Sequence, residues 1–178
     1  MSIPAIWMSV LLYWASSPVG AAQPEPMPTR NLNGLTAVIL EGSIADTDRV
    51  AKALGAQLVS RKGPIDYDFE QRFITTRPED SGVRELLFTK GSLPDDVTLV
   101  LYFDPRYCVR VADLTAMLRA ESKPWRLPRT AHGSPFDTVE AGQHIAVRST
   151  SGVPVGIIAP AAAQGCTGQL SIHSSVKQ

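Results

Sequence analysis

The sequence has no excess of charge of either sign. Its 178 residues include 17 Lys and Arg and 17 Asp and Glu, so the formal net charge is zero. A nucleic-acid-binding protein normally presents a basic surface, and the chain also lacks a phosphate-binding glycine loop and the aromatic RNP pattern. We therefore expect no nucleic-acid partner and no cofactor.

The first 22 residues contain no Lys, Arg, Asp or Glu. Ile6–Trp14 is almost continuously apolar and is followed by the small residues Gly20–Ala22, a pattern typical of a secretory signal peptide. A membrane-spanning helix needs about 20 apolar residues, and Pro18 interrupts this run earlier. We expect residues 1–22 to be a cleaved signal peptide, which leaves no membrane span and a periplasmic or secreted protein. An uncleaved membrane anchor is the alternative.

Cysteine is scarce, since Cys108 and Cys166 are the only two in the chain. An even number of cysteines in an exported protein favours a disulfide, because disulfides persist in oxidising compartments. The alternative, a redox-active thiol, usually comes with a Cys-x-x-Cys motif or a base nearby in sequence, and neither is present. We predict a structural Cys108–Cys166 disulfide.

The domain organisation follows from composition. Residues 23–33 contain three prolines and little to bury, which is typical of an extended, solvated linker. Residues 34–174 are enough for a single α+β domain with a sizeable core. The alternative division is two tandem modules, 34–107 and 108–174.

Apolar patterning predicts a mostly antiparallel sheet with two short helices. The helices are expected at about residues 45–55 and 109–120, where apolar residues follow helical spacing. Residues 121–142 contain three prolines and are not assigned. The predicted strands are Leu35–Leu40, Ile65–Ile74, Val83–Thr89, Val97–Phe103, His144–Thr150, Val153–Ala159 and Thr167–His173.

The two predicted helices suggest an internal repeat, because one shift of 64 residues places Val50 on Leu114 and Leu54 on Leu118. With the exported context and this order of elements, residues 35–173 resemble the tandem helix-plus-sheet modules of beta-lactamase inhibitory proteins and of small outer-membrane assembly lipoproteins. The resemblance concerns topology and carries no residue roles. It implies a protein that binds another protein rather than an enzyme.

Histidine is also scarce, and two hypotheses involve it. His132, Ser134 and Asp137 are the residue types of an acyl-transfer site, but the members of such sites normally converge from separate elements. We interpret these three as polar loop residues. A metal could be bound by His132, His144 and His173, yet their spacing matches no short ligand motif. We expect no metal site, with His144 and His173 on strand faces or ends.

A first candidate binding surface lies in the unassigned, proline-rich stretch. Trp125 and Phe136 occur there with Arg126 and Arg129. Aromatic residues beside arginine are typical of interface hot spots, and loops carry function more often than frameworks do. The alternative is that Trp125 packs back onto the sheet.

A second candidate surface is acidic. Asp66, Asp68 and Glu70 alternate with apolar residues, so they share one face of a predicted strand. There they could contact a basic partner or a cation, or form a solvated strand face that discourages edge pairing.

Together these features predict a non-enzymatic, exported module that binds another exported or envelope protein, as an inhibitor, an immunity protein or an envelope accessory does. The alternative is a small exported hydrolase that uses His132 and a carboxylate. A binder of small envelope molecules is a third hypothesis, which a deep apolar pocket would support.

Overall fold

The computed structural model describes residues 24–61, 70–91, 96–126, 141–160 and 165–174. Its helices are α1 (Thr29–Glu41), α2 (Thr47–Leu54), α3 (Pro78–Ser81) and α4 (Val111–Leu118). A large sheet comprises β2 (Leu58–Ser60), β3 (Glu70–Thr75), β4 (Val83–Lys90), β5 (Val97–Phe103), β7 (Ser122–Arg126), β8 (Ala141–Arg148), β9 (Pro154–Pro160) and β11 (Gln169–Ser174). A small sheet comprises β1 (Glu25–Pro26), β6 (Tyr107–Arg110) and β10 (Cys166–Thr167).

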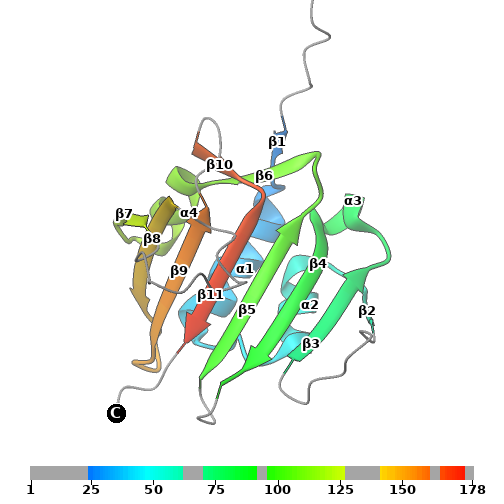
Figure 1. Ribbon diagram of the computed structural model, residues 1–178, viewed down its shortest axis with the longest axis horizontal. Helices are drawn as coiled ribbons and strands as arrows, with labels where there is room; N and C mark the ends of the chain where they lie inside the picture. The colour runs from blue at the N-terminus through cyan, green and yellow to red at the C-terminus, as the bar shows by residue number, and fades with distance from the viewer. Residues whose placement is uncertain (1–23, 62–69, 92–95, 127–140, 161–164, 175–178) are drawn as a thin grey trace, which may run out of the picture.

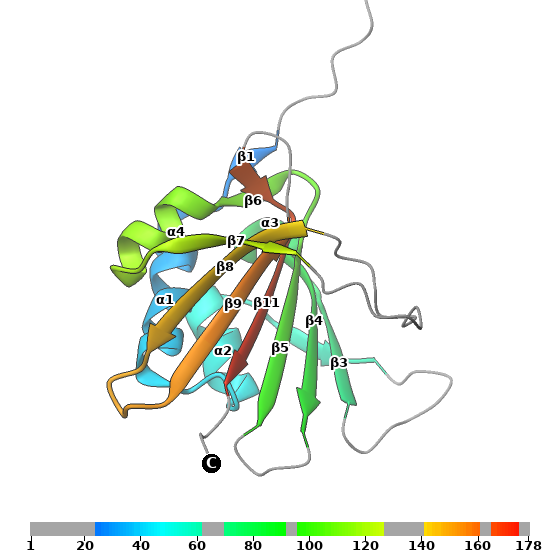
Figure 2. The ribbon, with the colours of Figure 1, turned by 60° about the vertical axis from the view of Figure 1, so that its left-hand side comes forward.

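The large sheet is antiparallel throughout, with the strand order β2-β3-β4-β5-β11-β9-β8-β7. Helices α1, α2 and α4 lie against one of its faces, as Figure 1 and the turned view of Figure 2 show. The predicted fold class, α+β with a mostly antiparallel sheet, is confirmed. The two predicted helices correspond to α2 and α4, and α1 and α3 are additional.

The core fills the space between these helices and the inner face of the sheet. Every second residue of the central strands is buried there, including Leu99 and Leu101 of β5 and Leu170 and Ile172 of β11. The helices contribute side chains that are fully buried: Leu35, Ile39, Val50, Leu54 and Leu114. Strand alternation and helical spacing therefore bury one face of each element in a single core.

Residues Leu35–Leu40, predicted as a buried strand, lie inside helix α1. Leu32, Leu35 and Ile39 follow helical spacing and are all buried. The helix ends at Gly42, whose φ of 71° is in the left-handed region that favours glycine. A continuous apolar run has no period of its own, so sequence does not separate a buried strand from a buried helix. The strand prediction at this place is wrong.

The segment 23–33, predicted as a solvated linker, belongs to the folded domain over most of its described length. Strand β1 pairs in parallel with β6, and the side chain of Met27 is buried in the core. Helix α1 begins at Thr29, directly after Pro28. Because proline is tolerated at the start of a helix, proline content alone did not distinguish a linker from a helix start.

The two helices that suggested a repeat are both present in the structure. Helices α2 and α4 are both eight residues long and correspond under the shift of 64, with Val50 and Leu54 buried in one and Leu114 and Leu118 in the other. Each helix precedes four strands of the large sheet, β2–β5 after α2 and β7, β8, β9 and β11 after α4. The two sets meet at β5 and β11 and share one core.

The predicted disulfide is also present, between Cys108 of β6 and Cys166 of β10. The two strands pair antiparallel in the small sheet, and the Cα atoms of the two cysteines are 5.5 Å apart. The disulfide thus joins the segment between β5 and α4 to the segment between β9 and β11.

Five predicted strands are confirmed to within three residues at each end, as β4, β5, β8, β9 and β11. The strand predicted at Ile65–Ile74 corresponds in part to β3, and residues 65–69 lie outside the described residues. Strand β7 was not predicted, because Pro124 argues against a strand. The structure places this proline in an edge strand, where the missing N–H interrupts no second ladder.

Candidate functional site: the open face of the sheet

The face of the large sheet that points away from α1, α2 and α4 is called the open face here. Among the residues that the structure describes, no helix covers it, and Figure 2 shows α1, α2 and α4 gathered on the opposite side. Strand register places a row of side chains across it from β3 to β7: Arg72, Leu87, Val100, Ser171, Ile158, His144 and Lys123. These side chains are partly or fully exposed.

The open face combines apolar and charged groups. Leu87 and Val100 are paired neighbours near its middle. Towards the β2 edge, Val59 and Ile74 are also paired neighbours and keep 49% and 37% of their surface exposed. The nearby ion pair between Arg72 Nε and Glu85 Oε1 has a length of 3.0 Å. Partly exposed apolar residues bordered by charged ones have the composition of a protein-binding surface.

Two histidines come together on the open face. His144 of β8 and His173 of β11 have ring centres 6.3 Å apart, with an angle of 16° between the ring planes. Strand β9 runs between them, and Gly156 faces His173 in the register. A Cβ atom on Gly156 would lie 2.3 Å from Nε2 of His173, so glycine leaves the space that this imidazole occupies.

The environment of His173 favours its neutral form. Burial lowers the pKa of His173 below its usual value, and the positive charge that His144 can carry lowers it further, while Asp96 acts in the opposite direction. Both histidines were expected on strand faces or ends, and they lie within β8 and β11. Their positions in sequence do not predict that the strand register brings the two rings together.

The lowered pKa of His173 predicts a stability that depends on pH. The unfolded chain binds a proton at this histidine near pH 6.5 and the folded protein does so only at lower pH, so acidification favours unfolding. We expect the free energy of unfolding to fall between pH 7.5 and pH 5.5, and to fall less in His173→Gln. Urea denaturation at the two pH values measures this. An equal fall in both proteins would contradict the assignment.

The described candidates for the binding surfaces lie in strands that are far apart in the sheet. Glu70 lies in β3 and Trp125 and Arg126 lie in β7, so five strands of the sheet separate the two groups. The other candidate residues lie outside the described residues. They are Asp66, Asp68, Arg129 and Phe136 of the binding hypotheses and His132, Ser134 and Asp137 of the catalytic one.

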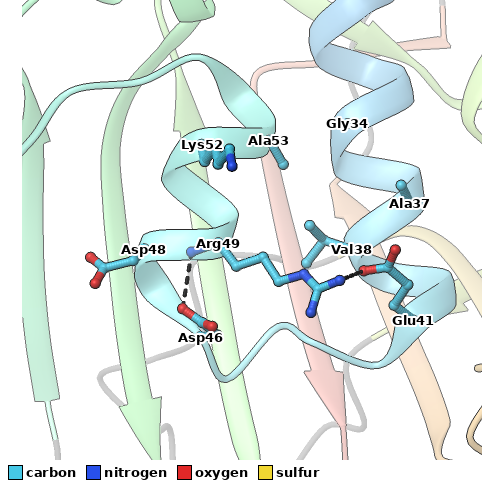
Figure 3. Close-up of a pocket in the computed structure, with 9 residues that line it drawn as sticks. All are labelled: Gly34, Ala37, Val38, Glu41, Asp46, Asp48, Arg49, Lys52 and Ala53. Atoms are coloured by element: carbon cyan, nitrogen blue, oxygen red, sulfur yellow. Dashed lines mark hydrogen bonds and ion pairs between the residues drawn. The ribbon is translucent and has the colours of Figure 1, made fainter.

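A groove of about 730 Å³ lies on the opposite side of the molecule, between α1 and α2 (Figure 3). Charged side chains line much of it, including an ion pair of 2.5 Å between Arg49 and Glu41. Asp46 caps α2 by accepting a hydrogen bond of 2.9 Å from the backbone N–H of Arg49. The groove is open and charged, unlike the deep apolar pocket expected of a small-molecule binder.

Clusters of three or more metal-ligating side chains and long apolar helices are both absent among the described residues. In the part of the chain that the structure describes, no three or more His, Cys, Asp or Glu side chains are arranged to hold a metal ion. No described helix is long and apolar enough to cross a membrane. Comparison with known proteins finds no matching family model, no matching curated protein and no matching solved structure.

Proposed function

We propose that this chain is an exported, non-enzymatic module that binds another exported or envelope protein through the open face of its sheet. The observation that carries the proposal is the one-sided architecture. Eight strands form a continuous sheet with α1, α2 and α4 on one face, and the other face presents partly exposed apolar side chains. Sizeable exposed apolar surface on a folded protein commonly marks an interaction site.

The size of the open face suits a protein partner. Eight strands at about 4.8 Å spacing give a sheet roughly 34 Å wide, and strands of six residues are roughly 20 Å long. A specific interface takes about 800 Å² from each partner, so most of this face would be used. A flat surface of this extent suits another folded protein better than a small molecule, which requires a concave site.

The composition of the face supports the same conclusion. Leu87, Val100 and Ile158 give it an apolar middle, and charged residues lie towards the two edges, with Arg72 in β3 and Lys123 in β7. Interfaces of moderate affinity have an apolar centre and a polar rim of this kind. The leader-like first 22 residues and the disulfide support an exported location.

The proposal is tested by affinity capture from the periplasmic or secreted fraction of the source organism. We expect the wild-type protein to retain a stoichiometric partner and Val100→Lys to lose it, because the new charge lies in the middle of the open face. The matched control is Ala37→Lys, which places the same charge on an exposed position of α1 in the helical layer. Circular dichroism and thermal unfolding of both variants establish that they fold.

Two results would overturn the proposal. The first is recovery of the wild-type bait alone from fractions in which the protein is naturally present, which would show that it has no stable protein partner there. The second is that a folded Val100→Lys variant keeps the partner and Ala37→Lys loses it. The binding surface would then lie in the helical layer and not on the open face.

A further inference from the structure

The side chains of His144 and His173 approach each other across an intervening strand. Strands β8 and β11 are second neighbours in the sheet, so their backbones lie about 10 Å apart. The ring centres are nevertheless only 6.3 Å apart. Both side chains therefore lean towards β9 on the open face.

Gly156 of β9 makes this approach possible. A Cβ atom at this position would lie 2.3 Å from Nε2 and 2.6 Å from Cε1 of His173. The nitrogen-bearing edge of the ring thus lies directly over the glycine backbone, in space that every other residue type would fill. Glycine inside a strand commonly marks such a close approach.

The separation of the rings suits a shared metal ion. A histidine nitrogen binds zinc at about 2.0–2.1 Å, which puts the centres of two imidazoles on one ion roughly 5–6.5 Å apart. The observed 6.3 Å lies within this range. The nitrogen lone pairs lie in the ring planes, which are nearly parallel, so both rings must rotate about their bonds to Cβ before one nitrogen of each faces a common ion.

The electrostatic surroundings also suit a cation. Asp96 precedes β5 by one residue and acts on His173 as a negative charge. This carboxylate offsets part of the cost of bringing a positive ion to the sheet.

We propose that His144 and His173 together bind one divalent transition-metal ion on the open face. Two imidazole ligands favour zinc, nickel or copper, whereas magnesium and calcium require oxygen ligands. With two protein ligands, the ion keeps open positions that water fills. This inference is independent of the proposed protein-binding function.

The test is calorimetric titration of the full, untagged chain with zinc and with nickel at pH 7.5. We expect one ion per chain, and an affinity that falls roughly tenfold or more in His144→Gln and in His173→Gln. The third histidine of the chain provides the matched control, because His132→Gln is expected to bind like the wild type. Calcium is expected not to compete.

A fourth variant separates metal binding from a merely structural role of the histidines. Gly156→Ala keeps both imidazoles but fills the space under His173, so we expect a loss of zinc affinity comparable to that of the His173 variant. Thermal unfolding without metal verifies that each variant folds. The proposal is overturned if the wild type shows no saturable site, if both folded histidine variants bind as the wild type does, or if His132→Gln abolishes binding.

Discussion

Loss of the disulfide is expected to destabilise the protein by about 4 kcal/mol. Cys108 and Cys166 are 58 residues apart in sequence, and the chain-entropy model assigns a loop of this length about that much stabilisation. A small domain has a total free energy of unfolding of about 5–15 kcal/mol, so the disulfide contributes a large share of it. Urea denaturation of a Cys108→Ser, Cys166→Ser double variant measures the loss.

The control is to measure the wild type and the double variant with and without a reducing agent. We expect dithiothreitol to destabilise the wild type to the level of the double variant and to leave the double variant unchanged. The central strands β5 and β11 contain no cysteine, so reduction should not disrupt them directly. Under conditions where the reduced protein stays folded, we expect its far-ultraviolet circular dichroism to keep the strand signal. A difference of less than about 1 kcal/mol between oxidised and reduced wild type would contradict the stabilising role given to this disulfide.

Gly34→Ala is the second change with a large expected effect. Alanine inside a helix normally stabilises it by about 1 kcal/mol relative to glycine. Here a Cβ atom would lie 2.0 Å from the backbone oxygen of Ala53, because α1 and α2 approach closely at this point, as Figure 3 illustrates. The two helices would have to move apart, and overpacking of this kind costs about 1–3 kcal/mol. We therefore expect the substitution to destabilise the protein.

Gly168→Ala is the control for this prediction. Nothing lies within 4 Å of a Cβ atom at Gly168, and its φ is outside the left-handed region. We expect its free energy of unfolding to stay within about 0.5 kcal/mol of the wild type. If Gly34→Ala proved as stable as the wild type or more stable, the close packing of α1 on α2 would be wrong.

The strands at the centre of the sheet were predictable because their residue patterns favour a strand over a helix or a loop. Val97–Phe103 is a short run rich in β-branched and aromatic residues, bounded by turn residues, and the pattern assigns it correctly. Helix α1 was not predictable in the same way, since all residues of its run Leu35–Leu40 except Thr36 are apolar and the run shows no clear alternation. Only the tertiary contacts with α2 and the sheet decide its conformation.

The candidate site was less accessible to sequence reasoning than the fold. An open face exists only once the strand order is known, and local patterns do not give that order. The approach of His144 and His173 depends on register across three strands. Gly156 within a predicted strand was the one available signal, because an isolated glycine in a strand often marks a close approach.

The most direct test of the central claim is methyl NMR of the protein with and without its captured partner. The claim predicts that the methyl signals of Leu87, Val100 and Ile158 shift or broaden on binding. Those of Ala37 and Ala116, exposed on α1 and α4, should stay in place. Perturbation of the two helix alanines with an unperturbed open face would contradict the claim that this protein binds its partner through the sheet.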